Sequence, residues 1–252
     1  MEILDENRMK WKPLLLSFGV IAFLWATFLT PWTAPLWNAL DTAVFKTLNG
    51  TLEGNTFLQY FWGVINHKRM DLVEDVVFLL FFIWGVKEAP RGLRWKKTAE
   101  FIAVILLASS VIFFINRNLL RYNVFLPRES PSLVVSPCVR ITDEIPWEGL
   151  KDETIASFPG DHATTLLLFG FLFSAFASKR LSKAAWIYVL FRSLPRLVVG
   201  AHWLSDIAVG SMTIALFFAA CFLYTPLGRV TISMIERLKP KKAVHGAEKK
   251  PL

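Results

Sequence analysis

The chain has 252 residues, of which 54% are hydrophobic and 14% aromatic, and it carries a formal net charge of +8. Ten Trp and 22 Phe are more than a water-soluble domain of this size needs, and several apolar runs approach the roughly 20 residues that span a bilayer. We therefore predict one all-α, polytopic membrane domain, in which the positive charge reports topology before nucleic-acid binding. Cys138 and Cys221 have no paired spacing, which argues against a disulfide framework or a zinc site.

Six apolar segments are predicted to be transmembrane helices. In chain order they are about 13–32, 72–88, 98–116, 162–179, 183–200 and 203–224. The first begins after a mixed-charge head, and its apolar run is followed by Pro31-Trp32-Thr33 without a small-residue cleavage site, so we do not expect it to be a cleaved signal. Between the first two, residues 36–49 (LWNALDTAVFKTLN) have apolar residues near helical spacing. This pattern fits an interfacial helix on the outer surface.

The Lys and Arg residues between these segments are distributed unevenly. They cluster in the N-terminal head, in the loop at 87–97, in the turn at 179–183 and in the tail after 229. With six spans, all four clusters lie on one side, which the positive-inside rule makes cytoplasmic. We therefore predict that both termini are cytoplasmic, that residues 1–235 form the membrane domain, and that 236–252 is a basic, disordered tail.

Charged and polar residues gather at the predicted outer end of the last two spans. Arg192 and Arg196 lie within the fifth span, where an ionised group is costly and usually functional. His202 and Asp206 follow, four residues apart, and this spacing on a helix puts both on one face. Asp206 can then orient the imidazole and leave its second nitrogen free for nucleophilic attack. The alternative is a helix cap with an interfacial cation and a polar-aromatic belt.

The long loop before the fourth span brings further groups to the same side. It contains Arg121 and Arg128, and it ends in the sequence SFPGDH at residues 157–162. Gly160 permits a close approach to the free amides of a helix N-terminus, which suits a phosphate, and His162 can act as a general acid. Asp161 is interpreted as the N-cap of this helix, or alternatively as a residue that selects a diphosphate donor. The alternatives are an arginine-rich rim facing lipid phosphates and an interfacial histidine.

Together these stretches resemble the three-part signature of the type 2 phosphatidic acid phosphatases. The matching parts are Arg121-x6-Arg128, then residues 159–162 (PGDH), then Arg196-x5-His202-x3-Asp206. The resemblance implies a membrane core of six helices and a phosphohistidine mechanism without metal or cofactor. It also implies roles: His202 is the nucleophile, Asp206 orients it, His162 protonates the leaving group, and the phosphate is held by Arg128, Arg196, the Gly160 amide and Arg121.

The sequence departs from the usual family pattern at several positions. Arg121 replaces a Lys, Glu129 follows Arg128 where Pro is usual, residues 159–162 read PGDH in place of PSGH, and Pro195 replaces a Ser. In these stretches the chain is similar to bacterial members that transfer a phosphate between lipids. That likeness implies undecaprenyl diphosphate as donor, the 1-phosphate of lipid A as acceptor, and a periplasm-facing site in the inner membrane. Asn66 and Asp71 stand near an Asn and an Asp of those members and are weaker site candidates.

Two other functions stay open at this point. An undecaprenyl diphosphate phosphatase would use water as acceptor, and Asp161 does not separate it from a transferase. The stretch GAHWLSDIAVGSMT at 200–213 favours transfer. A lipid transporter or non-catalytic lipid-binding relative is disfavoured because the set of His162, Arg196, His202 and Asp206 is complete.

Overall fold

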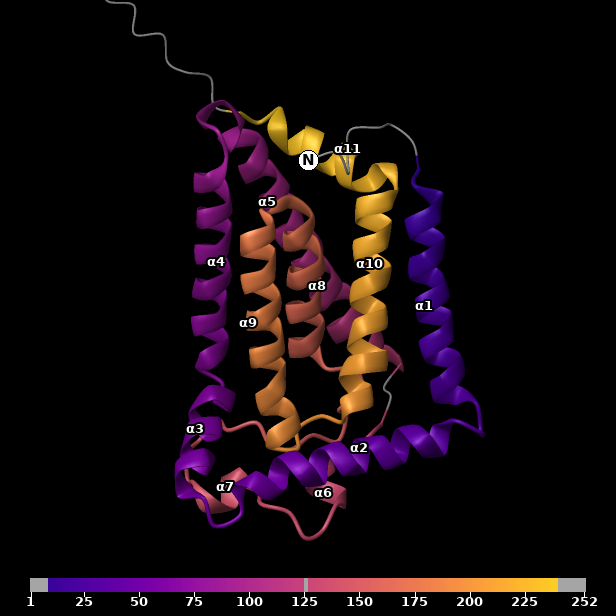
Figure 1. Ribbon diagram of the computed structural model, residues 1–252, viewed down its shortest axis with the longest axis vertical. Helices are drawn as coiled ribbons and strands as arrows, with labels where there is room; N and C mark the ends of the chain where they lie inside the picture. The colour runs from indigo at the N-terminus through magenta and orange to yellow at the C-terminus, as the bar shows by residue number, and fades with distance from the viewer. Residues whose placement is uncertain (1–8, 125–126, 240–252) are drawn as a thin grey trace, which may run out of the picture.

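The computed structural model describes residues 9–124 and 127–239, and within these ranges every named element is helical. Six helical segments stand side by side in a bundle (Figure 1). Each coincides with one of the six predicted segments. They are α1 (Trp11–Leu29), α4 (Met70–Glu88), α5 (Arg94–Ser110) continued by η3 (Val111–Val124), α8 (Asp161–Phe176), α9 (Lys179–Val198), and η4 (Asp206–Ser211) continued by α10 (Met212–Tyr224).

Three helical segments of the described chain are long and apolar enough to cross a membrane: Trp11–Leu29, Arg91–Leu120 and Asp206–Tyr224. The apolar helix α8 has 16 residues and is shorter than this standard. Both α4 and α9 have the necessary length, but they carry ionisable side chains such as Glu74 and Arg192. The chain is therefore a membrane protein with three candidate spans among its described residues, and the crossing of all six helices stays a prediction.

Helix α8 lies at the centre of the bundle and packs against α5, α9 and α10. Its central rings, Phe169 and Phe173, stack on each other at 5.1 Å between centroids and contact Phe82 of α4. Close approach of α4 and α5 depends on Gly85, because a Cβ there would lie 2.6 Å from the Phe101 ring. Within a bilayer such packing, and not apolar burial from water, holds helices together.

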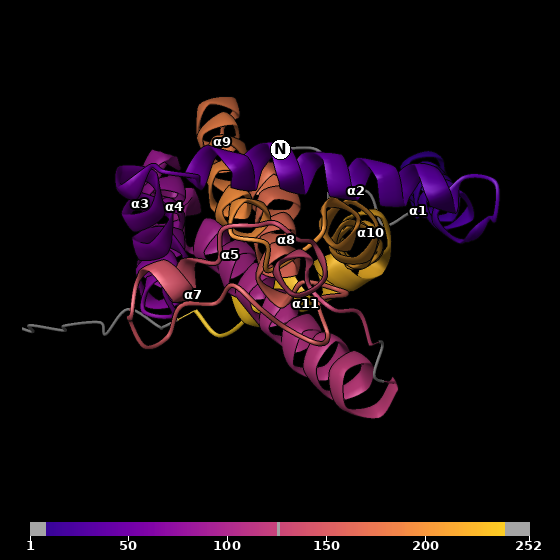
Figure 2. The ribbon, with the colours of Figure 1, turned by 90° about the horizontal axis from the view of Figure 1, so that it is seen from below.

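A second set of helices lies across the two ends of the bundle. Helix α2 (Ala34–Asn49) runs from α1 toward α3 (Thr56–Asn66) across the lower end of the bundle in Figure 1, the end that faces the viewer in Figure 2, which confirms the helix predicted between the first two spans. The short helices α6 (Pro131–Val134) and α7 (Ile141–Glu144) lie at the same end. At the opposite end lies α11 (Pro226–Glu236), which the sequence reading did not predict. Residues 240–252, most of the predicted disordered tail, fall outside the described residues.

The helix of the third predicted span is longer than predicted. Its helix continues from Ser110 through η3 to Val124, eight residues beyond the predicted end at 116. Polar residues in this extension do not stop the helix, because the side-chain amide of Asn118 donates to the Phe113 carbonyl at 2.9 Å. The extension shortens the long loop predicted before the fourth span and places Arg117 beside α4 and α8.

Candidate active site

The candidate site forms at the lower end of the bundle in Figure 1, where α4 and α8 begin, α9 ends and α2 crosses. The connection after α9 turns at Gly200, whose φ of 79° lies in the left-handed region that favours glycine. The amides of Ala201 and His202 both donate to the Arg196 carbonyl, at 2.9 and 3.2 Å. The backbone of Arg196 therefore fixes the position of His202.

His202 lies in this turn and not on a helix, which corrects the predicted placement. The predicted sixth span began at 203, whereas η4 begins at Asp206. The two side chains still meet, since Nδ1 of His202 is 3.6 Å from Oδ2 of Asp206. A turn therefore produces the proximity that the four-residue spacing was expected to produce on a helix.

The His202 ring is held in one tautomer by its neighbours. Its Nδ1 lies 2.8 Å from the Ser157 carbonyl oxygen, which can only accept, so in the neutral ring Nδ1 carries the proton and Nε2 keeps its lone pair. Asp206 is fully buried, and its Oδ2 also accepts from the Trp203 amide at 2.8 Å. The hydrogen bond to Nδ1 that was predicted for Asp206 is therefore made by the Ser157 carbonyl, which no sequence pattern indicated, and the orienting role of Asp206 stays a prediction.

The free Nε2 faces the start of α8. A Cβ at Gly160 would lie 3.3 Å from Cε1 and 3.4 Å from Nε2 of His202, so glycine allows the imidazole to approach the start of α8 closely. The Ser211 hydroxyl donates to the Gly160 carbonyl at 2.9 Å, which ties α8 to η4. Gly160 is the N-cap of α8 and Asp161 its first helical residue, so the N-cap interpretation of Asp161 is wrong. As a first-turn carboxylate Asp161 still interacts favourably with the helix dipole.

Arg128 is held by two buried carboxylates. One is Asp206, and the other is Asp41 of α2, which accepts from the guanidinium at 2.8 Å. The Arg128 guanidinium also donates to the Ser205 hydroxyl at 2.8 Å, and Asp41 accepts from the Ser205 amide at 2.8 Å. Asp41, only 1% exposed, thereby joins α2 to the segment that carries His202. The sequence reading missed Asp41, although an acidic residue on the buried face of an amphipathic helix was an available signal.

A second polar cluster surrounds His162. Oε2 of Glu74, on α4, lies 3.0 Å from Nε of Arg192 and 3.4 Å from Nε2 of His162. Arg192 also donates to the Ile65 carbonyl at 2.8 Å. Within the part of the chain that the structure describes, Nε2 of His162 is buried without a hydrogen-bond partner. Glu74 was also missed, and its signal was an acid inside an apolar segment.

The weaker candidates Asn66 and Asp71 both lie beside Arg196. Oδ1 of Asn66 accepts from Arg196 at 2.6 Å, and Oδ1 of Asp71 is 3.7 Å from the same guanidinium. Lys151 connects them, because its carbonyl accepts from the Asn66 amide at 2.8 Å and its ammonium pairs with Asp71. The backbone of Arg121 belongs to η3, but its side chain is outside the described part of the structure, and its phosphate-binding role stays a prediction.

The buried pair between Glu74 and Arg192 yields a prediction about stability. Both residues are 4% exposed, so Arg192→Ala leaves an uncompensated buried carboxylate. We expect the free energy of unfolding to fall by about 3–5 kcal/mol, seen as a lower midpoint of thermal unfolding in detergent. Arg180→Ala, at an exposed position of the same helix, is the matched control and should change little. Equal midpoints for the two variants would contradict this role of the pair.

A bundle of membrane helices that gathers an oriented histidine, arginines and a helix N-terminus at one end defines a class of enzymes that act on lipid phosphates. Residues 102–229, half of the chain, match the PAP2 superfamily. The chain belongs to that superfamily, which confirms the resemblance to the type 2 phosphatidic acid phosphatases. The matched range contains Arg128, His162, Arg196, His202 and Asp206.

The chain also resembles a curated relative along almost all of its length. It is 29% identical over 240 residues to "Lipid A 1-diphosphate synthase" of Escherichia coli (strain K12), an alignment that covers 92% of this chain and 94% of the relative. No solved structure matches the chain significantly.

Proposed function

We propose that the protein transfers the distal phosphate of undecaprenyl diphosphate to the 1-phosphate of lipid A, through a phosphohistidine on His202. The products are undecaprenyl phosphate and lipid A 1-diphosphate. The observation that carries the proposal is the close approach of Nε2 of His202 to Gly160, the N-cap of α8, while Nδ1 lies 2.8 Å from the Ser157 carbonyl oxygen. The likeness to a lipid A 1-diphosphate synthase over most of both chains supports these substrates. Inner-membrane location and a periplasm-facing site are part of the same proposal.

In the first step the Nε2 lone pair attacks the distal phosphorus of the donor. The N–P bond forms as the bond to the bridging oxygen breaks, and its electron pair stays on that oxygen. His162 gives a proton to the departing undecaprenyl phosphate. The charge that spreads over the phosphoryl oxygens is stabilised by Arg196 and by the backbone amides at the start of α8. It is also stabilised by the N–H groups of Arg128 that make no hydrogen bond to Ser205, Asp206 or Asp41.

In the second step an oxygen of the lipid A 1-phosphate attacks the phosphorus on His202. The N–P bond breaks, and its electron pair returns to Nε2. The acceptor oxygen is already anionic, so this step needs no base, whereas water would need one. His162 regains its proton from solvent. No step requires a metal or a cofactor, and we expect activity to survive excess chelator.

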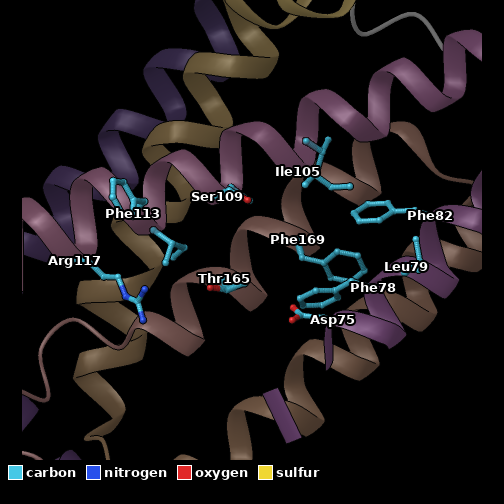
Figure 3. Close-up of a pocket in the computed structure, with 13 residues that line it drawn as sticks. Asp75, Phe78, Leu79, Phe82, Ile105, Ser109, Phe113, Arg117, Thr165 and Phe169 are labelled. Carbon is cyan, nitrogen blue, oxygen red and sulfur yellow. The ribbon is translucent and has the colours of Figure 1, made fainter. Parts of the chain in front are cut away.

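A lateral cavity supports a substrate with a hydrocarbon chain. It has a volume of about 490 Å³ and lies between α4, α5 with η3, and α8 (Figure 3). Phe78, Phe82 and Phe169 form an apolar wall, whereas Asp75 and Arg117 supply ionisable groups. Thr165, one turn after Asp161 on α8, lines the cavity and donates to the Asp161 carbonyl at 3.1 Å. A lipid chain held there would leave its phosphate near the start of α8.

Filling this cavity should weaken lipid binding. Ala108→Trp places a large ring among the lining residues, so we expect the KM for undecaprenyl diphosphate to rise about tenfold with little change in kcat. Leu106→Trp, at a 53% exposed position of the same helix, is the matched control and should leave KM unchanged. Steady-state kinetics in mixed micelles measure both. An unchanged KM for Ala108→Trp would remove the cavity from substrate binding.

The acceptor decides between transfer and hydrolysis, and the purified protein can be tested for it directly. Incubated with undecaprenyl diphosphate alone, it should release little inorganic phosphate. Added lipid A should become one phosphate heavier by mass spectrometry. Rapid phosphate release with unmodified lipid A would show that the protein is a phosphatase and overturn the transferase proposal.

A further inference from the structure

A second cavity, of about 310 Å³, lies beside Arg128 at the same end of the bundle. Its volume is at the lower limit of the roughly 300–1,000 Å³ typical of small-molecule sites. It is distinct from the lateral cavity, because its walls come from α2, the loop after η3 and the turn that carries His202. Its polar and aromatic lining consists of Asn38, Asp41, Thr42, Arg128, Glu129 and Trp203.

The α2 wall presents unused hydrogen-bonding groups. Asn38 and Thr42 lie one helical turn apart on the same face. Within the described residues, neither side chain has a hydrogen bond to another protein group. Asn38 offers an amide donor and a carbonyl acceptor, and Thr42 offers a hydroxyl that can do either. These donors and acceptors suit a ligand that carries several hydroxyl groups.

The charges of the cavity disfavour a bare anion. Arg128 contributes one positive charge, whereas Asp41 and Glu129 contribute two negative charges. Three of the five N–H groups of Arg128 are already taken by Ser205, Asp206 and Asp41. A phosphate would therefore face net repulsion in this cavity, but uncharged hydroxyl groups can donate to the carboxylates.

Trp203 adds an apolar surface of fixed orientation. Its Nε1 donates to the Glu129 carbonyl at 2.8 Å, and its ring lies 5.5 Å from the Arg128 guanidinium carbon. An aromatic ring beside hydroxyl-binding groups suits a sugar, which has C–H groups on its faces and hydroxyls at its edge. Trp203 also follows His202 directly in the chain, so a sugar against it lies next to the predicted nucleophile.

We propose that this cavity binds the sugar ring of the acceptor, the ring that carries the phosphate to be extended. The inference rests on the proposed function, which makes a phosphorylated glycolipid the acceptor. The sugar lies between α2 and Trp203, and its phosphate projects past Arg128 toward His202. Asn38 and Thr42 then determine acceptor specificity without touching the transferred phosphate.

Equilibrium binding to the detergent-solubilised protein, followed by native mass spectrometry, tests this assignment. Lipid A is compared with phosphatidate, a lipid phosphate without a sugar. The wild type should bind lipid A more tightly than phosphatidate. The double variant Asn38→Ala, Thr42→Val should raise the Kd for lipid A about tenfold and leave the Kd for phosphatidate unchanged. Thr47→Val makes the same substitution at an exposed position of α2 outside the cavity and should leave both unchanged.

Several results would overturn the sugar site. The first is equal affinity of the wild type for the two lipids. The second is an unchanged Kd for lipid A in the double variant, and the third is an equal rise in the Kd of that variant for both lipids. Binding is measured without turnover, so failure of the proposed function is visible separately. It would be seen as lipid A that binds with sugar-dependent affinity but gains no phosphate from undecaprenyl diphosphate.

Discussion

Replacing His202 with alanine should lower the rate of undecaprenyl phosphate formation at least about 10⁴-fold, because the variant lacks the proposed acceptor of the phosphoryl group. The ring lies in the turn between α9 and η4 and its printed hydrogen bond is to the Ser157 carbonyl, so we expect the bundle to remain folded without it. Initial rates measured with saturating undecaprenyl diphosphate, together with the midpoint of thermal unfolding, separate lost chemistry from lost structure.

His67 provides the matched control for this substitution. It lies between α3 and α4 at the same end of the bundle, and its Nε2 contacts the Glu148 carbonyl at 2.8 Å, outside both polar clusters of the site. His67→Ala should keep a rate within about twofold of the wild type. A His202→Ala variant that retains more than about a tenth of the wild-type rate would exclude His202 as the nucleophile.

Replacing Arg128 with alanine should reduce both activity and stability. The substitution leaves Asp41 and Asp206, which are 1% and 0% exposed, as neighbouring carboxylates without their cation. We expect the free energy of unfolding to fall by about 3–5 kcal/mol. We also expect the rate to fall at least about 100-fold, because the carboxylates repel the phosphoryl oxygens and His202 loses its fixed surroundings.

A second substitution distinguishes the two losses. Asp41→Asn in the Arg128→Ala background removes one of the uncompensated charges, so much of the stability should return, as measured by thermal unfolding. The rate should stay low, because the cation near the phosphate is still missing. Recovery of the full rate together with stability would show that Arg128 acts only through the fold.

Much of the bundle was predictable because each helix has a long apolar run of its own. The helix at α2 was also readable, since its apolar residues recur at helical spacing. The extension of η3 to Val124 was not, because a polar stretch such as Asn116-Arg117-Asn118 reads as the start of a loop. Helix α11 was not predicted for a related reason: it begins at Pro226 and is too short and too polar to stand out as a span.

In the candidate site, contacts between residues close in the sequence were predictable, whereas contacts between residues far apart in the sequence were not. Sequence spacing alone predicted that His202 lies beside Asp206, although the turn that contains His202 was predicted as a helix. It also predicted that Gly160 lies at the start of α8. Asp41 and Glu74 lie 87 and 118 residues from their arginine partners, and no local pattern links residues so far apart. Both are acids in apolar surroundings, and a search for their partners would have been the available signal. The hydrogen bond from His202 to the Ser157 carbonyl involves backbone and leaves no trace in residue identity.

A pulse-chase measurement tests the central claim most directly, namely that the phosphate passes from one lipid to the other through His202. Undecaprenyl diphosphate labelled in its distal phosphate is mixed with protein, the reaction is quenched within the first turnover under alkaline conditions, and the labelled peptide is sequenced. The label should lie on His202, and a chase with lipid A should move it to lipid A 1-diphosphate before it enters inorganic phosphate. Label in lipid A product without any labelled His202, or label that leaves His202 only as inorganic phosphate, would contradict the account.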